Sequence, residues 1–161
     1  MITLRPLAPG DIPVIKSWPP YPEEFSELDY SLRDDGWLDH YGPAGGSEIF
    51  VGEDSAGIVG FTILTREDGS CPEFRIALNP EKLGQGNGRT LTGLTLAQAF
   101  SRADCPCIRL IVRKNNIRAQ KLYEQLGFRR TGECVEDVQG RPVAFYRMEL
   151  SKQEFLRSDH E

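Results

Sequence analysis

The chain contains the stretch Leu83-Gly84-Gln85-Gly86-Asn87-Gly88-Arg89, in which three glycines alternate with larger residues. An apolar, extended run precedes it and a helical pattern follows it. Alternating glycines permit positive φ and the close approach of a ligand to the main chain. A helix that begins here directs unpaired N–H groups and the positive end of its dipole into the loop. The stretch therefore predicts a site for a phosphate or pyrophosphate.

The spacing of these glycines excludes two common phosphate-binding motifs. A P-loop requires Gly-Lys-Ser/Thr at its end, whereas Arg89 and Thr90 follow Gly88. A dinucleotide fingerprint that starts at Gly84 requires a third glycine where Arg89 stands. On this stretch alone, a flexible loop that enters a helix stays open as an alternative.

Composition indicates an ordinary globular protein. The 161 residues include 39% hydrophobic and 27% charged residues, with a net charge of −5, and we expect a single domain over residues 1–161. The negative charge disfavours nucleic acid as a partner. No apolar run approaches the ~20 residues that span a bilayer, and the N-terminus lacks the pattern of a secretory signal. We therefore expect a cytoplasmic protein without a membrane partner.

Cysteine and histidine give no metal-binding pattern. The four cysteines are Cys71, Cys105, Cys107 and Cys134. Cys105 and Cys107 are separated by one residue and have no second ligand pair nearby. With only two histidines, we expect no metal site and free or buried thiols; the alternative is a redox-active or catalytic cysteine.

Charge is unevenly distributed along the chain. Residues 21–40 carry seven acidic residues and one basic residue, Arg33, whereas residues 101–130 carry eight basic residues and two acidic ones. These segments are either two solvated faces or the neighbourhoods of a cationic and an anionic ligand, respectively.

Periodicity predicts a mixed α/β (α+β) layer, with a central sheet of about six to seven strands flanked by helices. We expect strands at 2–5, 48–52, 58–65, 74–78, 108–112, 128–135 and 143–150. We expect helices from Asp11, over Glu23–Leu38, over Asn87–Ala103 and over Ile117–Leu126. Residues 54–57 and Gln139-Gly140 read as hairpin turns.

A second motif makes the pattern specific. It reads Asn116-Ile117-Arg118-Ala119-Gln120-Lys121-Leu122-Tyr123-Glu124-Gln125-Leu126-Gly127-Phe128. This pattern resembles the second hallmark of the GNAT superfamily, the acyl-CoA-dependent N-acyltransferases: Asn, two residues, Ala, two residues, Leu-Tyr and then Gly-Phe. The opening segments Leu4-Arg5-Pro6 and Asp11-Ile12-Pro13 are also similar to the start of that family, so the resemblance covers nearly the whole chain and implies the GNAT fold.

The glycine stretch resembles the first hallmark of the family, Arg/Gln, two residues, Gly, one residue, Gly/Ala. Here Leu78-Asn79-Pro80 is followed by Leu83, Gly86 and Gly88, so Leu83 stands where the family has Arg or Gln. In the family this loop holds the pyrophosphate of coenzyme A largely through main-chain N–H groups. The departure should therefore weaken binding rather than abolish it, and Lys82 or Arg89 is a hypothetical replacement for the lost side chain.

The resemblance implies acetyl-CoA as acyl-donor cosubstrate. The backbone around Ile76 and Leu78 is expected to pair with the pantetheine amides like an added strand. Asn116 faces the pantetheine arm or an ordered water, or else is a plain helix cap. The predicted cofactor-binding residues are Ile76, Leu78, Leu83, Gly84, Gln85, Gly86, Asn87, Gly88, Arg89, Asn116 and Tyr123.

The chemistry implied is direct transfer of an acetyl group from the thioester to a primary amine of a small molecule or peptide. Tyr123 matches the family's tyrosine that donates a proton to the leaving sulfur, and a phenol with a pKa of about 10 stays protonated at neutral pH. Glu73 lies where several members carry a glutamate and is the candidate general base. A surface glutamate at this position and a water chain without a dedicated base are the alternatives.

The acceptor site is expected from the first helices and the last hairpin, with Trp18, Tyr21, Phe25 and Tyr146 as candidate walls. The acidic residues 23–39 favour a cationic amine such as a polyamine, a lysine side chain or a peptide amino terminus. The protein is expected to be a monomer or homodimer. The leading alternative is a non-catalytic acyl-CoA-binding sensor or partner module with the same fold; another kind of phosphate binder is a remote third.

Overall fold

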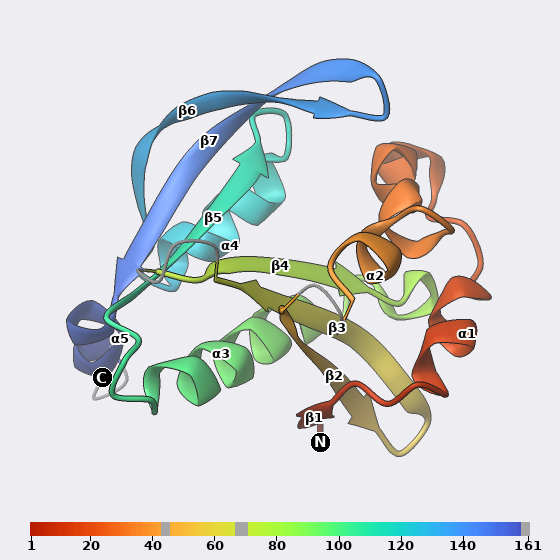
Figure 1. Cartoon of the computed structure of the whole chain (residues 1–161), viewed down its shortest axis with the longest axis horizontal. Helices are drawn as coiled ribbons and strands as arrows, with labels where there is room; N and C mark the ends of the chain where they lie inside the picture. The colour runs from red at the N-terminus through yellow and green to blue at the C-terminus, as the bar shows by residue number, and fades with distance from the viewer. Residues whose placement is uncertain (43–45, 67–70, 159–161) are drawn as a thin grey trace. The chain divides into compact units, whose positions relative to one another are not determined.

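The computed structural model describes residues 1–42, 46–66 and 71–158, and its elements follow the predicted order (Figure 1). They are β1 (Thr3–Pro6), α1 (Asp11–Lys16), the 3₁₀ helix η1 (Glu23–Leu32), α2 (Trp37–His40), β2 (Glu48–Asp54), β3 (Gly57–Thr65), β4 (Glu73–Leu78), the 3₁₀ turn η3 (Pro80–Lys82), α3 (Asn87–Phe100), β5 (Cys107–Arg113), α4 (Ile117–Gln125), β6 (Arg129–Val138), β7 (Arg141–Ser151) and α5 (Lys152–Ser158). Within these residues, no helix is both long and apolar enough to cross a bilayer.

The strands form a mixed sheet of seven, in the order β1-β2-β3-β4-β5-β7-β6. The pairs β1–β2, β2–β3, β5–β7 and β6–β7 are antiparallel, whereas β4 and β5 are parallel. The mixed sheet and the predicted hairpins are thus confirmed. The chain divides into two compact units, Met1–Arg66 with Arg75–Ala97, and Glu67–Phe74 with Gln98–Glu161.

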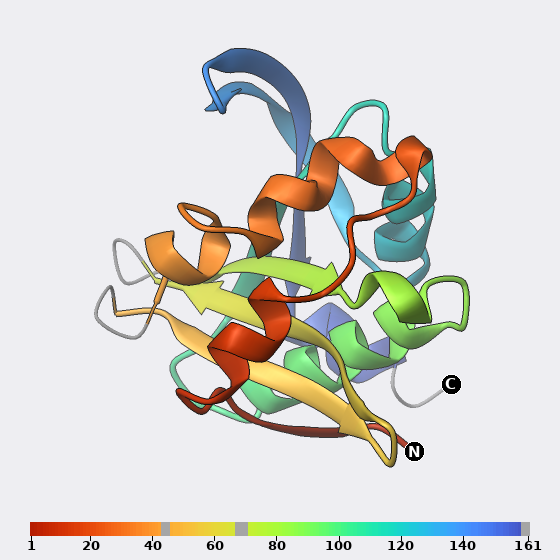
Figure 2. The same cartoon turned by 90° about the vertical axis from the view of Figure 1, so that its right-hand side faces the viewer.

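The first unit packs helices on both faces of its strands (Figure 2). Alternation along β2 and β3 directs one set of side chains toward α1 and the other toward α3. The α1 side holds a core cluster, which consists of Ile15, Trp18, Tyr21, Leu32, Leu38, Ile49, Val51, Phe61, Ile63 and Ala77. On the other side, Leu91 of α3 lies so close to the strands that a Cβ at Gly52 would be 2.6 Å from its Cδ1 and one at Gly60 3.0 Å from its Cδ2.

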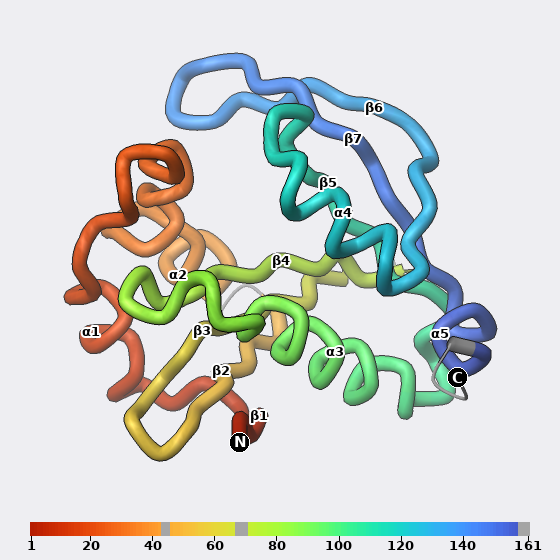
Figure 3. Tube along the Cα trace, turned by 180° about the vertical axis from the view of Figure 1, so that it is seen from behind, coloured from red at the N-terminus to blue at the C-terminus, as the bar shows by residue number. Residues whose placement is uncertain are grey.

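The second unit contains β5, β7, β6 and α4 (Figure 3). Its buried side chains include Ile108, Leu110, Met148 and Leu150, which alternate along β5 and β7. The β6–β7 turn is made by Gln139 and Gly140, which both have positive φ, 53° and 82°. This matches the predicted hairpin.

The predicted helix over Glu23–Leu38 is wrong in its geometry. The segment is a 3₁₀ helix to Leu32, followed by extended Arg33 and by Asp35 at φ 61°, before α2 begins at Trp37. Tertiary contacts interrupt the helix, because the Arg33 guanidinium donates to the carbonyl of Trp18 at 2.7 Å. Local periodicity does not report such a contact.

The expectation of free or buried thiols is also wrong for two of the four cysteines, because Cys71 and Cys107 form a disulfide. The pairing follows from sheet register, since Glu73 on β4 lies opposite Arg109 on the parallel strand β5. Cys71 lies two residues before Glu73, and Cys107 lies two residues before Arg109. In this parallel register the two cysteines therefore come together, with their Cα atoms 5.1 Å apart. Cys105 and Cys134 are not part of a disulfide, and the Cys105 thiol donates to the carbonyl of Cys107 at 3.6 Å.

Candidate functional site

The glycine stretch forms an open loop between η3 and α3. Gly84 and Gly86 have φ of 74° and 77°, a region that other L-residues rarely adopt. Nothing lies within 4 Å of a Cβ built at either position. Asn87 begins α3, so the first N–H groups of that helix have no intrahelical partner. An open glycine loop at the start of a helix is the kind of site that binds anionic groups.

Asn79 holds the chain between β4 and this loop. Its side chain is buried, accepts a hydrogen bond from the N–H of Glu81 at 3.0 Å and donates to the carbonyl of Ile58 at 3.1 Å. Its own N–H donates to Val59 at 2.8 Å. The Leu78-Asn79-Pro80 motif did not by itself indicate this role, although an Asn before Pro in a turn is a signal for it.

Leu83, at the position of the missing Arg/Gln side chain, and its neighbour Lys82 both have contacts within the protein. Leu83 is half-buried and packs against the α1-side core cluster, so this position contributes an apolar contact in place of a charge. The ammonium of Lys82 lies 3.3 Å from both carboxylate oxygens of Asp54. Lys82 therefore bridges η3 to the β2–β3 turn, whereas Gln85 and Arg89 are exposed.

The amino-terminal end of α4 is built from two polar side chains. Asn116 is the helix cap, because its Oδ1 accepts the N–H of Ala119 at 3.1 Å; its predicted contact with the pantetheine arm stays a prediction. Gln120 is buried and donates to the carbonyls of Arg113 and Lys114, each at 2.9 Å. Gln120 thus orders the segment between β5 and α4, a role that the sequence reading missed although Gln120 lies inside the second motif.

Tyr123 lies on α4 with its ring enclosed by aromatic neighbours. The ring centroids of Phe74 and Phe128 are 6.5 Å and 5.7 Å away, both in edge-to-face arrangements. Burial raises the pKa of the Tyr123 hydroxyl above its usual value of 10.0. The hydroxyl is therefore protonated across the neutral range and is available as a hydrogen-bond donor.

Glu73, the candidate general base, is the first residue of β4 and is half-buried. Its cross-strand neighbour is Arg109, whose Nε donates to the carbonyl of Cys71 at 3.1 Å. The second unit thus holds both predicted catalytic residues, Tyr123 and Glu73.

The four candidate acceptor residues are divided between the units. Trp18 and Tyr21 are buried in the first unit's core, and Phe25 packs against it. The Tyr21 hydroxyl donates to the carbonyl of Leu78 at 2.5 Å, which ties this aromatic residue to the end of β4. Tyr146, in the second unit, lies under two cations, with the Arg130 guanidinium carbon 3.6 Å and the Lys114 ammonium 5.1 Å from its ring centroid.

The acidic segment is partly neutralised by two bases. Arg33 pairs with Asp29 at 2.8 Å and holds the pKa of that carboxyl below its usual value. Lys16 pairs with Asp34 and Asp39 at 3.1 Å and 2.7 Å. The glutamates at positions 23 and 24 lie in the first turn of η1 and are exposed, so this turn presents negative charge to solvent.

Gly86→Ala is expected to raise the KM for acetyl-CoA about tenfold. A β-carbon at positive φ costs about 1–2 kcal/mol, and a methyl group would occupy the open side of the loop. Steady-state kinetics with varied acetyl-CoA measures the effect. Gly93→Ala is the matched control, because Gly93 lies within α3 and nothing is within 4 Å of a Cβ built there. Equal KM values for acetyl-CoA in both variants would contradict a ligand at the glycine loop.

The chain is similar to known proteins both in sequence and in fold. The Acetyltransferase (GNAT) family matches residues 15–128. The spermidine N(1)-acetyltransferase of Vibrio cholerae serotype O1 (strain ATCC 39315 / El Tor Inaba N16961) is 35% identical over 86 residues, which are 52% of this chain and 50% of the relative. The match thus spans half the length of that curated relative.

Two solved structures from Vibrio cholerae are similar over nearly their whole length. The spermidine N-acetyltransferase in complex with CoA and spermine is 27% identical, with a TM-score of 0.71 and coverage of 96% of this chain and 98% of that one. The spermidine/spermine N-acetyltransferase SpeG in complex with manganese ions is also 27% identical, with a TM-score of 0.75 and coverage of 98% and 96%.

Proposed function

Because the chain belongs to the acetyltransferase (GNAT) family, we propose that it transfers an acetyl group from acetyl-CoA to a primary amine. The observation that carries this proposal is the open loop at Gly84 and Gly86, directly before the amino-terminal end of α3, where a helix binds anionic groups. Coenzyme A is the acyl carrier whose pyrophosphate suits this loop. Residues 83–89 bind it, and the backbone of Ile76 and Leu78 pairs with its pantetheine arm.

The reaction requires a neutral amine. An ammonium of pKa about 10.4 loses its proton to Glu73 or to a chain of waters, and the nitrogen then attacks the thioester carbon. The new C–N bond forms an amide and the C–S bond breaks. CoA leaves as the free thiol, and the overall reaction releases one proton. The pH–rate profile of Glu73→Gln distinguishes Glu73 from the chain of waters as the base. The fall in rate at acidic pH changes in this variant only if the Glu73 carboxylate is the base.

Tyr123 acts on the departing sulfur as a hydrogen-bond donor. A phenol of pKa about 10 is a weaker acid than a thiol of pKa about 8.5, and burial raises the pKa of Tyr123 further. Complete proton transfer to the thiolate would therefore be unfavourable. A hydrogen bond that strengthens as charge develops on the sulfur lowers the barrier without that cost, which refines the expected general-acid role.

The acceptor is proposed to be a polyamine. The exposed first turn of η1, with Glu23 and Glu24, presents negative charge, and the similar proteins are named as spermidine acetyltransferases. Extended polycations gain affinity from separated carboxylates, because each exposed charge pair contributes up to about 1 kcal/mol.

A thiol-release assay with acetyl-CoA and a panel of amines tests the proposal. We expect spermidine and spermine to give kcat/KM values at least about tenfold above those of single amino acids and amino-terminal peptides, a difference of about 1.4 kcal/mol. Preference for a peptide would retain the acetyltransferase and replace the acceptor. CoA binding without thiol release for any amine would favour the non-catalytic acyl-CoA-binding module.

Three further properties remain predictions from the sequence. These are a single domain over residues 1–161, a cytoplasmic location and a monomeric or homodimeric state. Trp18, Tyr21, Phe25 and Tyr146 are likewise proposed contacts for the acceptor.

A further inference from the structure

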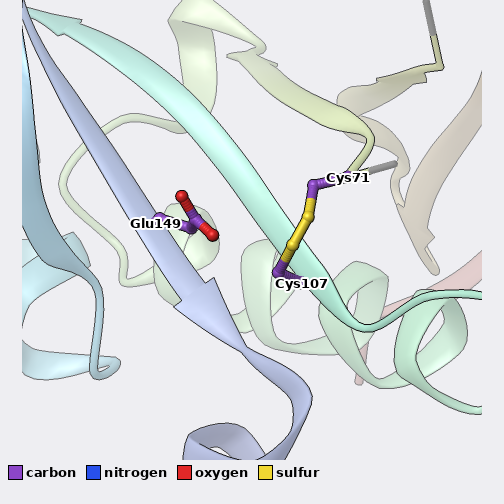
Figure 4. A group of neighbouring side chains, drawn as sticks. All are labelled: Cys71, Cys107 and Glu149. Atoms are coloured by element: carbon purple, nitrogen blue, oxygen red, sulfur yellow. A yellow bond between two sulfur atoms is a disulfide. The ribbon is translucent and has the colours of Figure 1, made fainter. Parts of the chain in front are cut away.

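The second unit brings together two cysteines and a carboxylate, from the segment before β4 and from the strands β5 and β7. Cys71 precedes β4 and Cys107 begins β5. On β7, Glu149 lies opposite Arg109, two residues after Cys107. Because side chains two residues apart in a strand share a face, Cys107 and Glu149 lie on the same side. Figure 4 shows the disulfide and the Glu149 carboxylate side by side.

The three side chains are close enough to share one ligand. Their Sγ and carboxylate oxygen atoms all lie within 4.8 Å of one another. Thiolate and carboxylate are both zinc ligands, with Zn–S near 2.3 Å and Zn–O near 2.1 Å, so tetrahedral ligands stand about 3.5–3.8 Å apart. After reduction, rotation about the side-chain torsions has to separate the two sulfur atoms from bonding distance, about 2.05 Å, to that spacing. Both cysteines are half-buried and Glu149 is exposed, so an ion can enter from solvent.

Backbone contacts hold the two cysteine segments independently of the sulfur–sulfur bond. The N–H of Arg109 donates to the carbonyl of Pro72 at 3.0 Å, and its Nε donates to the carbonyl of Cys71 at 3.1 Å. The N–H of Lys152 donates to Pro106 at 2.9 Å, next to Cys107. Opening the disulfide therefore leaves the two thiols side by side, as a preorganised chelating pair.

We propose that Cys71, Cys107 and Glu149 form a binding site for one thiophilic divalent cation of the zinc class, which replaces the disulfide when the protein is reduced. Two molecules of a low-molecular-mass thiol supply the electrons: the protein S–S bond breaks, two S–H groups form, and the reductant becomes its own disulfide. The cation then displaces the two thiol protons. One solvent molecule completes the four-coordinate set, and the ion joins the segment before β4 to the strands β5 and β7.

Cobalt and zinc titrations of the intact chain test this site. In phosphine-reduced, metal-free protein, Co²⁺ is expected to give thiolate-to-metal charge-transfer absorption that saturates at one ion per chain, and Zn²⁺ is expected to displace it. Cys107→Ser should abolish the absorption. Glu149→Gln, at an exposed position, should weaken Zn²⁺ binding at least about tenfold in competition with a chromophoric chelator.

Cys134→Ser is the matched control, because Cys134 is a free thiol on β6 outside the cluster, and it should leave affinity and stoichiometry unchanged. Circular dichroism of each variant reports whether the fold is retained. Three results would overturn the site: no charge-transfer band in the reduced protein, an unchanged band in Cys107→Ser, or equal Zn²⁺ affinity in Glu149→Gln and the parent protein. Undiminished binding by the disulfide form would also overturn it.

Discussion

Tyr123→Phe is expected to lower kcat about 100-fold while the KM for acetyl-CoA stays within about twofold of the parent value. The substitution removes only the hydroxyl, so the edge-to-face contacts with Phe74 and Phe128 remain. The lost hydrogen bond forms with the leaving sulfur as charge develops, so the loss falls on the chemical step. Removing one hydrogen-bond donor that stabilises charge in the transition state typically costs about 10²–10³-fold in kcat, and 100-fold corresponds to about 2.7 kcal/mol.

Single-turnover and steady-state thiol release measure this effect together. Tyr30→Phe serves as the control, because Tyr30 is a half-buried tyrosine on η1 with no role in the proposed chemistry. Its kcat should match that of the parent protein. If Tyr123→Phe also retained full turnover, Tyr123 would be an aromatic core residue and the leaving sulfur would be served by another donor.

Gly36→Ala is expected to lower the free energy of unfolding by about 3 kcal/mol. A Cβ at this buried position would lie 2.7 Å from the carbonyl oxygen of Arg33 and 2.9 Å from that of Ser31, and closer still to that of Tyr30. All three are backbone atoms, so relief requires a shift of the turn between η1 and α2. Overpacking of this kind typically costs about 1–3 kcal/mol, and three fixed neighbours place Gly36 at the upper end.

Chemical denaturation followed by tryptophan fluorescence gives this number. Gly10→Ala is the matched substitution, since Gly10 has φ −68° and nothing within 4 Å of a built Cβ. It should change the free energy of unfolding by less than about 0.5 kcal/mol. Equal midpoints for the two variants would contradict the close packing around Gly36.

Much of this fold was predictable from short stretches of sequence, because turns, hairpins and helix caps depend on residues that are neighbours in the chain. Gly84 and Gly86 indicated a loop with positive φ, and both have it. Apolar alternation indicated the β2–β3 and β6–β7 hairpins, which pair antiparallel. Asn116 at the start of a helical pattern indicated a cap, and its side chain accepts a hydrogen bond from Ala119. In each case the residue's own conformational preference decides the structure.

Long-range contacts explain what the sequence reading missed. The 3₁₀ geometry of residues 23–32 accompanies hydrogen bonds from Arg33 to Lys16 and Trp18, carbonyls more than ten residues away. The disulfide joins cysteines separated by 36 residues. No local pattern predicts either one, because register between strands distant in sequence is set only when the sheet assembles.

The amino-acid sequence by itself determined the glycine loop, the Asn116–Phe128 motif and hence the family, since these depend on residue type and short spacing. Only the tertiary structure decided what surrounds them. In it, Leu83 packs against a hydrophobic cluster, Lys82 forms an ion pair with Asp54, and Tyr123 lies among aromatic rings. The physical reason is that burial and ion pairing are properties of neighbours in space, and the pKa of Tyr123 depends on them.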